Sequence, residues 1–252
     1  MRIAIAGGTG TVGRHTAAAA RSRGHDVVIL SRSNGVDVQT GEGLANALIG
    51  VDALIDVTNT TTLFASTARK FFGTGTRNLL AAEATAGVQH HVALSIVGID
   101  DIDASYYAGK LAQERAIAAG HVPYTIARVA QFHEFAGQLL SGMGGPIAIM
   151  PTTLMRPVAA REVGAHLVAV AEDQPMKRTT DLVGPRDERL ADLARRQLTH
   201  EGSSRRVWEL QFPGSYGRGL ASGSLRGGAA RIEGKITFDA WLASEDHRGQ
   251  RP

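Results

Sequence analysis

The sequence predicts an α/β fold: a doubly wound parallel sheet followed by a small C-terminal annex. Three observations predict it. An apolar strand at residues 2–6 runs directly into a glycine-rich turn. Strands and helices then alternate as far as residue 129, the order that right-handed crossovers turn into a parallel sheet. Beyond residue 130 the segments are shorter and richer in glycine. We therefore expect a core at 1–130 and an annex at 131–252 that partly returns to the sheet, within a single structural unit.

Composition excludes several classes of protein. The 252 residues are 43% hydrophobic and 20% charged, with a net charge of +3 spread along the chain. No basic run interleaved with aromatic residues is present, so nucleic-acid binding is not indicated. The absence of cysteine excludes disulfides, thiolate metal sites and a cysteine nucleophile. No apolar run has the length of a membrane span, and a first strand at residue 2 leaves no room for a signal peptide, so we expect a cytoplasmic protein.

The glycine-rich turn is the most informative stretch of the chain. Residues 2–13 read RIAIAGGTGTVG, and the glycines fit both G-x-G-x-x-G and G-x-x-G-x-x-G. In a Rossmann unit such glycines make the tight turn, admit a pyrophosphate close to the backbone and let the next helix pack on the strand. That helix, expected from Thr11 to Arg23 with Gly24 as its stop, would point its free N–H groups at the phosphates. The stretch predicts a dinucleotide site.

The second strand, residues 26–30, ends in Ser31-Arg32-Ser33. An acidic residue at this place would bind the ribose 2′-hydroxyl of NAD and repel the 2′-phosphate of NADP. Two hydroxyls and a guanidinium favour NADP(H) instead. The alternative is a solvated turn in which Arg32 has no ligand.

Two further segments are expected to follow strands at the cofactor side. Residues 36–38 form a short candidate strand whose Asp37 either reaches the adenine or only serves a turn. After a short helix at 41–49, a strand at 51–57 leads into Thr58 and Asn59, which either line the cofactor or cap the next helix.

The remaining elements of the core follow in order. We expect a helix at 63–86 with Gly87 as its stop, a strand at 90–97, an acidic loop at 99–105, a helix at 106–119 and a strand at 124–129. His90 and His91 are adjacent and would face opposite sides of a strand, which is not the geometry of metal ligands. We therefore predict no metal site.

The annex is expected to hold shorter elements. The candidates are strands at 147–150, 155–158, 181–184 and 207–212, helices at 161–171 and 186–198, a surface loop at 213–228, a last short helix capped by Thr237 that holds Trp241, and a frayed tail at 246–252.

Three residues have the pattern of a catalytic set. Tyr106 and Lys110 stand four apart in a helical stretch, which places them on one helix face. A nearby ammonium stabilises a phenolate and lowers the tyrosine pKa, and such a tyrosine can protonate a carbonyl oxygen as hydride arrives. Ser95, near a strand end, would polarise the same oxygen. The alternative is that Tyr106 and Lys110 are an ordinary pair on the protein surface.

Together these motifs resemble the short-chain dehydrogenase/reductase superfamily. The motifs are GGTGTVG after the first strand, SRS after the second, SIVG after the fifth and YYAGKLAQE in the following helix. The chain is similar in particular to the atypical, NmrA-like group of NAD(P)H-binding proteins, a likeness that extends to YTIARVAQFHEF, RPVAAREV and ITFDAWL.

The resemblance implies a role for each matching residue. The pyrophosphate would be held by Gly7, Thr9, Gly10, Thr11, Val12 and Gly13, and the 2′-phosphate by Ser31 and Arg32. Asp37 and Val38 would edge the adenine, and Thr58 and Asn59 would lie beside the ribose. Ser95, Tyr106 and Lys110 would match the catalytic serine, tyrosine and lysine, and Lys110 would also bind the cofactor. Phe132 and His133 would border the substrate.

Three functions fit these residues. The first is an NADPH-dependent reductase of a carbonyl, quinone or activated double bond in a small organic molecule. The second is a non-catalytic NADP(H) sensor of the NmrA type, because some members of that group bind dinucleotide without turnover. The third is a nucleotide-sugar epimerase or dehydratase, for which the annex is short. In each case we expect a small-molecule ligand, no nucleic acid or membrane partner, and a monomer or homodimer.

Overall fold

A computed structural model describes residues 1–248, which form two compact units built from separated stretches of chain. Unit 1 comprises Met1–Ser95, Asp103–Arg128 and Val163–Thr180. Unit 2 comprises Ile96–Ile102, Val129–Glu162 and the chain from Asp181 onward. The boundary at residue 130 expected above therefore does not separate the two units, because the stretch from Val163 to Thr180 belongs with the first.

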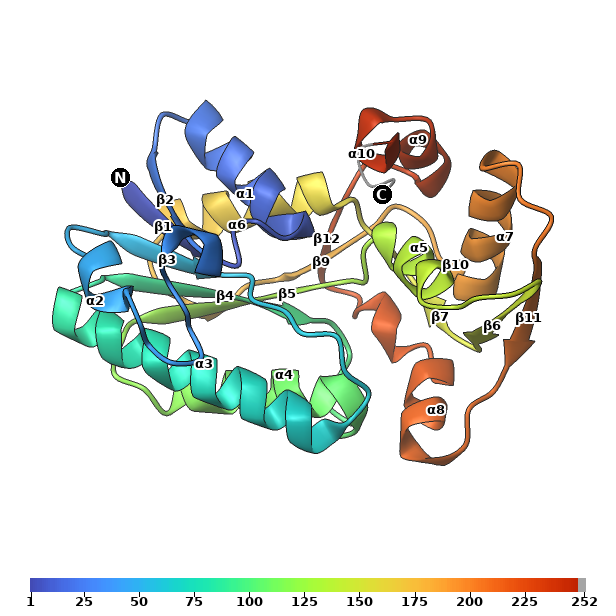
Figure 1. The fold of residues 1–252 in the computed structure, drawn as a ribbon, viewed down its shortest axis with the longest axis horizontal. Helices are drawn as coiled ribbons and strands as arrows, with labels where there is room; N and C mark the ends of the chain where they lie inside the picture. Colours follow the sequence, from blue (N-terminus) through green and yellow to red (C-terminus); the bar gives the residue numbers. More distant parts are fainter. Residues whose placement is uncertain (249–252) are drawn as a thin grey trace. The chain divides into compact units, whose positions relative to one another are not determined.

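Unit 1 is built on a parallel sheet, as the alternation of strands and helices predicted (Figure 1). Its strands are β1 (Arg2–Ala6), β2 (Asp26–Leu30), β3 (Ala53–Asp56), β4 (His90–Ile96) and β5 (Tyr124–Val129), in the order β2-β1-β3-β4-β5. Strand β8 (Lys177–Arg178) pairs in parallel with β5. Residues Ile3 to Ala6 of β1 are fully buried, as is usual for a parallel strand with both faces covered.

Helices cover both faces of this sheet. In Figure 1, α1 (Thr11–Ser22) and α6 (Ala160–Glu172) lie above it, and α3 (Ala65–Ala86) and α4 (Ser105–Ala118) lie below. Short helices α2 (Leu44–Ala47) and η1 (Arg32–Asn34) complete the unit. The predicted stops of the first and third helices are confirmed, since Gly24 and Gly87 both take the left-handed conformation at φ of 81° and 74°.

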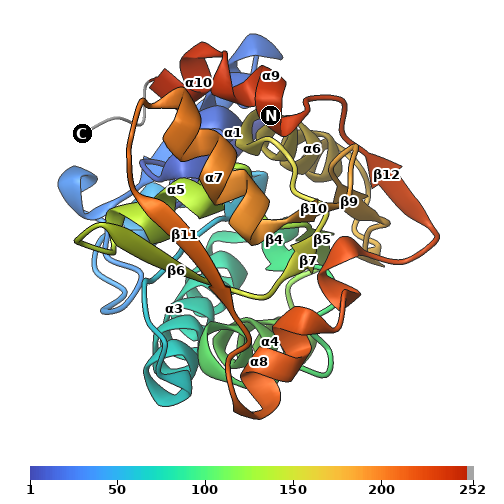
Figure 2. The same cartoon turned by 90° about the vertical axis from the view of Figure 1, so that its right-hand side faces the viewer.

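Unit 2 contains two separate two-stranded sheets, the paired strands β9 (Asp181–Val183) and β12 (Arg231–Glu233), and several short helices (Figure 2). Strand β9 pairs with Val129 and with β12, β6 (Ile147–Pro151) with β11 (Arg206–Leu210), and β7 (Leu154–Met155) with β10 (Glu188–Arg189). Its helices are α5 (Glu134–Ser141), α7 (Leu190–His200), α8 (Gly214–Ala221), α9 (Phe238–Leu242), α10 (Glu245–Arg248) and η2 (Ser224–Arg226). Helices α5, α7 and α9 share an apolar core around Leu193, Phe238 and Trp241.

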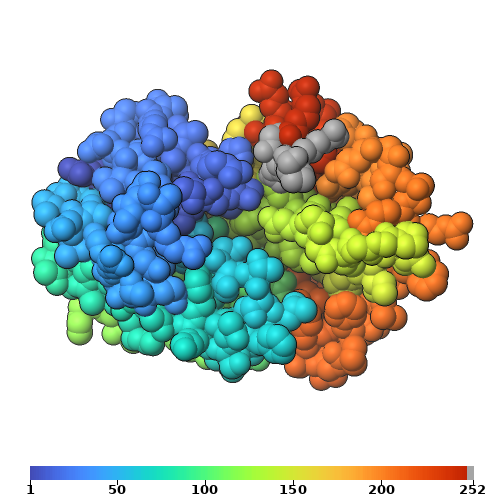
Figure 3. Space-filling view, viewed as in Figure 1, coloured from blue at the N-terminus to red at the C-terminus, as the bar shows by residue number. Residues whose placement is uncertain are grey.

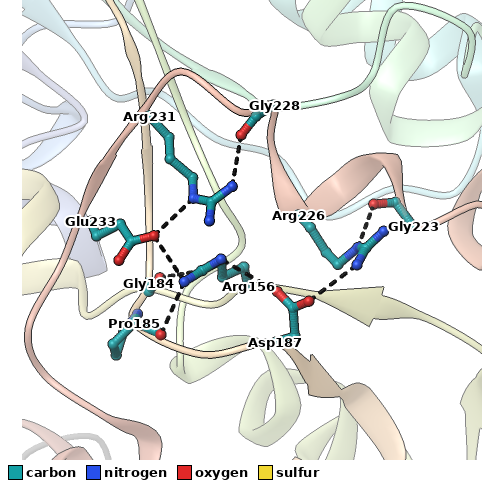
Figure 4. A network of polar contacts seen from close by, with 9 residues as sticks. All are labelled: Arg156, Gly184, Pro185, Asp187, Gly223, Arg226, Gly228, Arg231 and Glu233. Atoms are coloured by element: carbon teal, nitrogen blue, oxygen red, sulfur yellow. Dashed lines mark hydrogen bonds and ion pairs between the residues drawn. The ribbon is translucent and has the colours of Figure 1, made fainter.

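An arginine-centred network joins four distant stretches of unit 2 (Figure 4). The Arg156 guanidinium donates to the carbonyl oxygen of Gly184 at 2.8 Å and pairs with Glu233 at 2.9 Å. Glu233 also pairs with Arg231 at 2.9 Å, and Asp187 pairs with Arg226 at 3.1 Å. Each guanidinium thus meets carbonyl or carboxylate oxygens that compensate its charge.

Three expectations for local structure are wrong. Residues 36–38 form no strand, because the Asp37 carboxylate accepts a hydrogen bond from the Gln39 N–H at 2.7 Å and closes a turn. The expected loop at 213–228 contains α8 and η2, and the expected strand at 155–158 is only β7.

The Thr237 cap is confirmed, since its hydroxyl accepts from the Ala240 N–H at 3.3 Å. Of the expected frayed tail, residues 249–252 lie outside the described residues and Glu245–Arg248 form α10. Within residues 1–248, no helix combines the length and apolar character that a membrane span requires.

Candidate nucleotide and catalytic site

The glycine turn in unit 1 leaves no room for side chains. Gly7 has φ of 81°, and a Cβ there would lie 2.9 Å from the Val57 carbonyl oxygen. A Cβ on Gly13 would lie 2.2 Å from the Gly7 carbonyl oxygen, so only glycine lets α1 approach the turn this closely. Helix α1 begins at Thr11 after Gly10, which has no side chain to cap it. This arrangement is suited to an anion at the helix N-terminus, as the motif predicted.

The residues after β2 present a cation. Arg32 lies exposed in η1, and its guanidinium makes no hydrogen bond or ion pair with any described residue. The Ser31 and Ser33 hydroxyls hydrogen-bond to each other at 2.9 Å. Asp37 serves the turn described above, and the Val38 carbonyl oxygen accepts from Asn78 at 2.9 Å. Of the predicted adenine-side residues, only Arg32 therefore has an uncommitted charged group.

The segment after β3 connects to the predicted tyrosine. The Thr58 N–H donates to the Asp56 carboxylate at 2.8 Å. The exposed Asn59 accepts from the Thr60 N–H at 2.9 Å and from the Tyr106 hydroxyl at 2.7 Å. The stretch between β3 and α3 is largely exposed, and Figure 3 shows this part of the chain, coloured cyan to teal, at the surface. The structure thus brings Asn59 and Tyr106 together, a contact that sequence spacing did not predict.

The pKa of Tyr106 is raised, not lowered as the Y-x-x-x-K spacing predicted, and the catalytic role of this residue stays a prediction. Burial raises the pKa of its phenol above the ordinary value, and the negative charge of Asp56 adds to this. Its ring packs edge-on against Phe72, with the centroids 5.5 Å apart. The expected lowering by Lys110 is outweighed because a desolvated phenolate is unfavourable and the lysine is hydrogen-bonded elsewhere.

Lys110 is buried and belongs to a polar chain. Its ammonium donates to the side-chain oxygen of Gln113 and lies 4.6 Å from the centre of the Phe72 ring. The Gln113 amide donates to the Asp56 carboxylate at 2.7 Å. Burial lowers the pKa of Lys110 to about 8, against the opposing attraction of Asp56 and Glu114. A buried lysine of this kind is charged at neutral pH and able to lose its proton slightly above it.

Ser95 does not have the arrangement expected of a catalytic serine. It is buried, and its hydroxyl donates to Glu114 at 2.5 Å. The same carboxylate accepts from the Arg128 guanidinium at 2.8 and 2.7 Å. Because the single hydroxyl proton is given to Glu114, none remains to polarise a substrate oxygen. In this arrangement Ser95 connects β4 to helix α4, and its catalytic role stays a prediction.

Phe132 and His133 belong to unit 2. The His133 ring donates to the Ile236 carbonyl oxygen at 2.9 Å and packs against Phe238 and Trp241. Burial lowers its pKa to about 4, so it is uncharged. It is part of the aromatic core of this unit, and its substrate contact stays a prediction. Phe132 stays a predicted substrate residue.

Among the residues the structure describes, no group of three or more His, Asp or Glu side chains is placed to hold a metal ion.

Sequence reasoning missed three residues of this site. Asp56, Gln113 and Glu114 are all buried or nearly so. Gln113 contacts Lys110, Glu114 contacts Ser95, and Asp56 contacts Gln113. A signal was present for two of them, since Gln113 and Glu114 stand three and four residues after Lys110 and so share its helix face. Nothing in the local pattern marked Asp56, which reads as the polar end of a strand.

Comparisons with known proteins agree with the family that the motifs resemble. The photosystem II assembly factor Ycf39 of Synechocystis is 30% identical over 220 residues, 74% of this chain and 63% of that protein. The chain therefore resembles the atypical, NmrA-like short-chain dehydrogenases/reductases, in agreement with the motifs of the sequence. No family model matches it.

Two further similarities agree with this resemblance. The (4-alkanoyl-5-oxo-2,5-dihydrofuran-3-yl)methyl phosphate reductase of Streptomyces griseus is 29% identical over 226 residues, 84% of this chain and 68% of that protein. The fold matches an NADPH-dependent quinone oxidoreductase of Escherichia coli with a TM-score of 0.67 at 16% identity, over 96% of this chain and 98% of that one. The chain therefore has the Rossmann-type fold found in NAD(P)-binding oxidoreductases.

Proposed function

We propose that this protein is an NADPH-dependent oxidoreductase that transfers hydride to a carbonyl, quinone or activated double bond of a small organic molecule. The observation that carries the proposal is the strand order β2-β1-β3, which reverses direction between β1 and β3. Ligands of open α/β sheets bind outside the carboxyl ends of strands at such a switch point. The glycine turn follows β1, and Asn59, with its Tyr106 contact, follows β3.

The preference for NADPH rests on Arg32. Its exposed guanidinium has no carboxylate to compensate it among the described residues, and no acidic side chain directly follows β2. A 2′-phosphate would supply the missing negative charge and accept a bidentate pair of hydrogen bonds from the guanidinium.

The chain's own residues support proton delivery. The bound cofactor supplies the hydride. The raised pKa of Tyr106 keeps its hydroxyl protonated at neutral pH, and a substrate oxygen in the place of the Asn59 amide oxygen would accept that proton. Lys110 lies one turn later on the same helix, where its ammonium would contribute positive charge to the site.

The surroundings of Asn59 favour an apolar substrate. Leu63 and Phe64 come a few residues later and are 75% and 74% exposed, the highest values among the large exposed apolar side chains. Exposed apolar side chains next to polar groups are typical of ligand-binding surfaces. This supports a small organic substrate with an apolar body and one reducible group. The reductase named among the relatives also acts on a small organic molecule, by its name.

A paired titration with NADPH and NADH tests the cofactor proposal. We expect NADPH to bind at least tenfold more tightly, and the Arg32→Ala variant to lose most of that difference, because one charged hydrogen-bonding group is removed. Arg21→Ala removes another exposed cation, in the last turn of α1, and serves as the control. Equal affinity for both cofactors in the unaltered protein would refute the assignment of Arg32.

A screen of quinones, enones and ketones with NADPH then tests turnover. Tyr106→Phe is expected to lower kcat by 10²-fold or more, a typical size for general acid catalysis, while the NADPH Kd changes little. Unchanged kcat in a folded Tyr106→Phe variant would exclude Tyr106 as the proton donor.

A non-catalytic NADP(H)-binding protein is the second candidate. It is favoured by the name of Ycf39, an assembly factor. It predicts tight cofactor binding without cofactor oxidation by any acceptor in the screen.

A further inference from the structure

We propose that Gln113 and Asp56 are positioning residues that hold the Lys110 ammonium and set its charge state. The inference rests on the proposed function for the reaction that Lys110 serves. The contacts themselves come from one continuous chain of side chains inside unit 1. It runs from Lys110 through the Gln113 amide to the Asp56 carboxylate, and ends on the Thr58 N–H.

The side chains of this hydrogen-bonded series are buried, so losing any one of the contacts would cost free energy. Lys110, Gln113 and Asp56 are 3%, 1% and 1% exposed. A buried ammonium without an acceptor, or a buried carboxylate without a donor, is strongly unfavourable. Asp56 satisfies both of its oxygens, one with Gln113 and the other with the Thr58 N–H. The cation and the anion therefore compensate each other across the glutamine.

The amide of Gln113 is chemically suited to its place. A glutamine presents one acceptor and one donor, so it accepts from the ammonium and donates to the carboxylate at once. It also keeps the two charges one side chain apart. An aspartate in direct contact would hold the lysine fully protonated, whereas the separated arrangement leaves burial as the larger influence on its pKa.

The groups that face Lys110 come from three elements. Asp56 at the end of β3 and Glu114 on α4 attract the ammonium, and Tyr106 lies one turn before it on α4. Helix α3 contributes the uncharged ring of Phe72. The carboxylate of Glu114 is paired with Arg128, so Asp56 is the acidic group whose removal should change Lys110 most.

The test measures the ionisation of Lys110 directly. The chain has four lysines, and Lys70, Lys177 and Lys235 are exposed, so a ¹³C-lysine NMR titration of the full-length protein resolves the buried one, assigned by its loss in Lys110→Arg. In Asp56→Asn we expect the Lys110 midpoint to fall by about one pH unit, the size typical of losing a nearby opposite charge. Gln113→Met, similar in shape but without the amide, should shift it in the same direction.

Asp103→Asn is the matched control. It removes an acidic charge just before α4 whose side chain is 48% exposed and paired with Arg69, so its effect should be screened by water. We expect no change in the Lys110 midpoint. A solely structural role for Asp56 and Gln113 would lower thermal stability without moving that midpoint. An unmoved midpoint in either folded variant would overturn the proposal.

Activity adds a second readout. If the protein reduces a substrate with NADPH, the alkaline limb of its pH–rate profile should move to lower pH by the same amount in Asp56→Asn and Gln113→Met. If no acceptor is reduced, the proposed function fails, while the NMR titration still decides whether these two residues control Lys110.

Discussion

Gly109 shows how one residue fixes the distance between two helices. It lies inside α4, where glycine is unfavourable, next to Lys110. A Cβ at this position would lie 2.7 Å from the Cβ of Ala68 and 2.8 Å from its backbone carbonyl carbon. Only glycine therefore lets α4 pack this closely on α3. The close contact places Phe72 beside both Tyr106 and Lys110.

Gly109→Ala should therefore destabilise the protein. Alanine would otherwise favour the helix by about 1 kcal/mol, but the clash involves backbone of α3 that cannot simply rotate away. We expect a net loss of about 1–3 kcal/mol in the free energy of unfolding, measured by urea denaturation. Gly144→Ala, where no atom lies within 4 Å of the added methyl group, is the control and should be close to neutral. A Gly109→Ala variant as stable as the control would show that α3 and α4 separate freely.

At the residue scale, the sequence predicted which types of residue the site contains but not which groups they hydrogen-bond to. The spacing of Tyr106 and Lys110 was read correctly as one helix face. The hydroxyl of Tyr106 nevertheless binds Asn59, and the hydroxyl of Ser95 binds Glu114. Such contacts join residues from different elements, and the direction of a donor depends on tertiary packing that a local pattern does not contain.

At the scale of single elements, β4 and α3 share a buried histidine–glutamate pair. The His91 ring lies 2.8 Å from the Glu83 carboxylate, and both side chains are fully buried. Burial acts to lower the pKa of His91, but the attraction and hydrogen bond of Glu83 outweigh it, and the pKa is raised above its ordinary value. The adjacent His90, which contacts Thr125, has its pKa lowered by burial.

The pair predicts that stability falls at alkaline pH. A histidine whose pKa is higher in the folded than in the unfolded state contributes stability below its unfolded pKa. That contribution is lost as pH rises through the folded pKa. Urea denaturation between pH 6 and 9 should show this decline, and His91→Gln should remove it. His90→Gln, the control, should keep it, and a decline unchanged by His91→Gln would assign it to other groups.

The elements themselves were predicted best where the pattern was long and regular. Strands β1, β2 and β5 have the bounds the sequence predicted, and α3 differs only at its start. The expected strand at 36–38 failed because turn hydrogen bonds of Asp37 competed with the sheet. The prediction of a loop at 213–228 is wrong because this glycine-rich stretch contains a helix, α8, whose Gly217 and Leu220 are buried. Packing, not propensity, decides such short segments.

At the scale of the whole molecule, neither unit is one continuous stretch of chain. Unit 1 takes α6 and β8 from a stretch more than thirty residues after β5. A Cβ on Gly164 of α6 would lie 2.6 Å from the Thr16 backbone nitrogen of α1, so these helices are in close contact. Glu172 pairs with Arg23 at 2.6 Å, and the Thr179 N–H donates to the Ile126 carbonyl oxygen at 3.1 Å.

Two truncated chains should therefore behave differently. A fragment of residues 1–130 ends after β5 and lacks α6, so the α1 face that includes the fully buried Thr16 would be exposed to water. A fragment of residues 1–180 contains every stretch of unit 1. We expect the longer fragment to unfold cooperatively and to bind NADPH, and the shorter one to lack a cooperative transition, because Val163, Leu167 and Val168 are fully buried in the intact chain. Circular dichroism during thermal unfolding, with NADPH fluorescence as the second readout, compares the two. Equal cooperativity in both fragments would mean that β1 to β5 with their own helices suffice for folding, and that α6 only covers a sheet already formed.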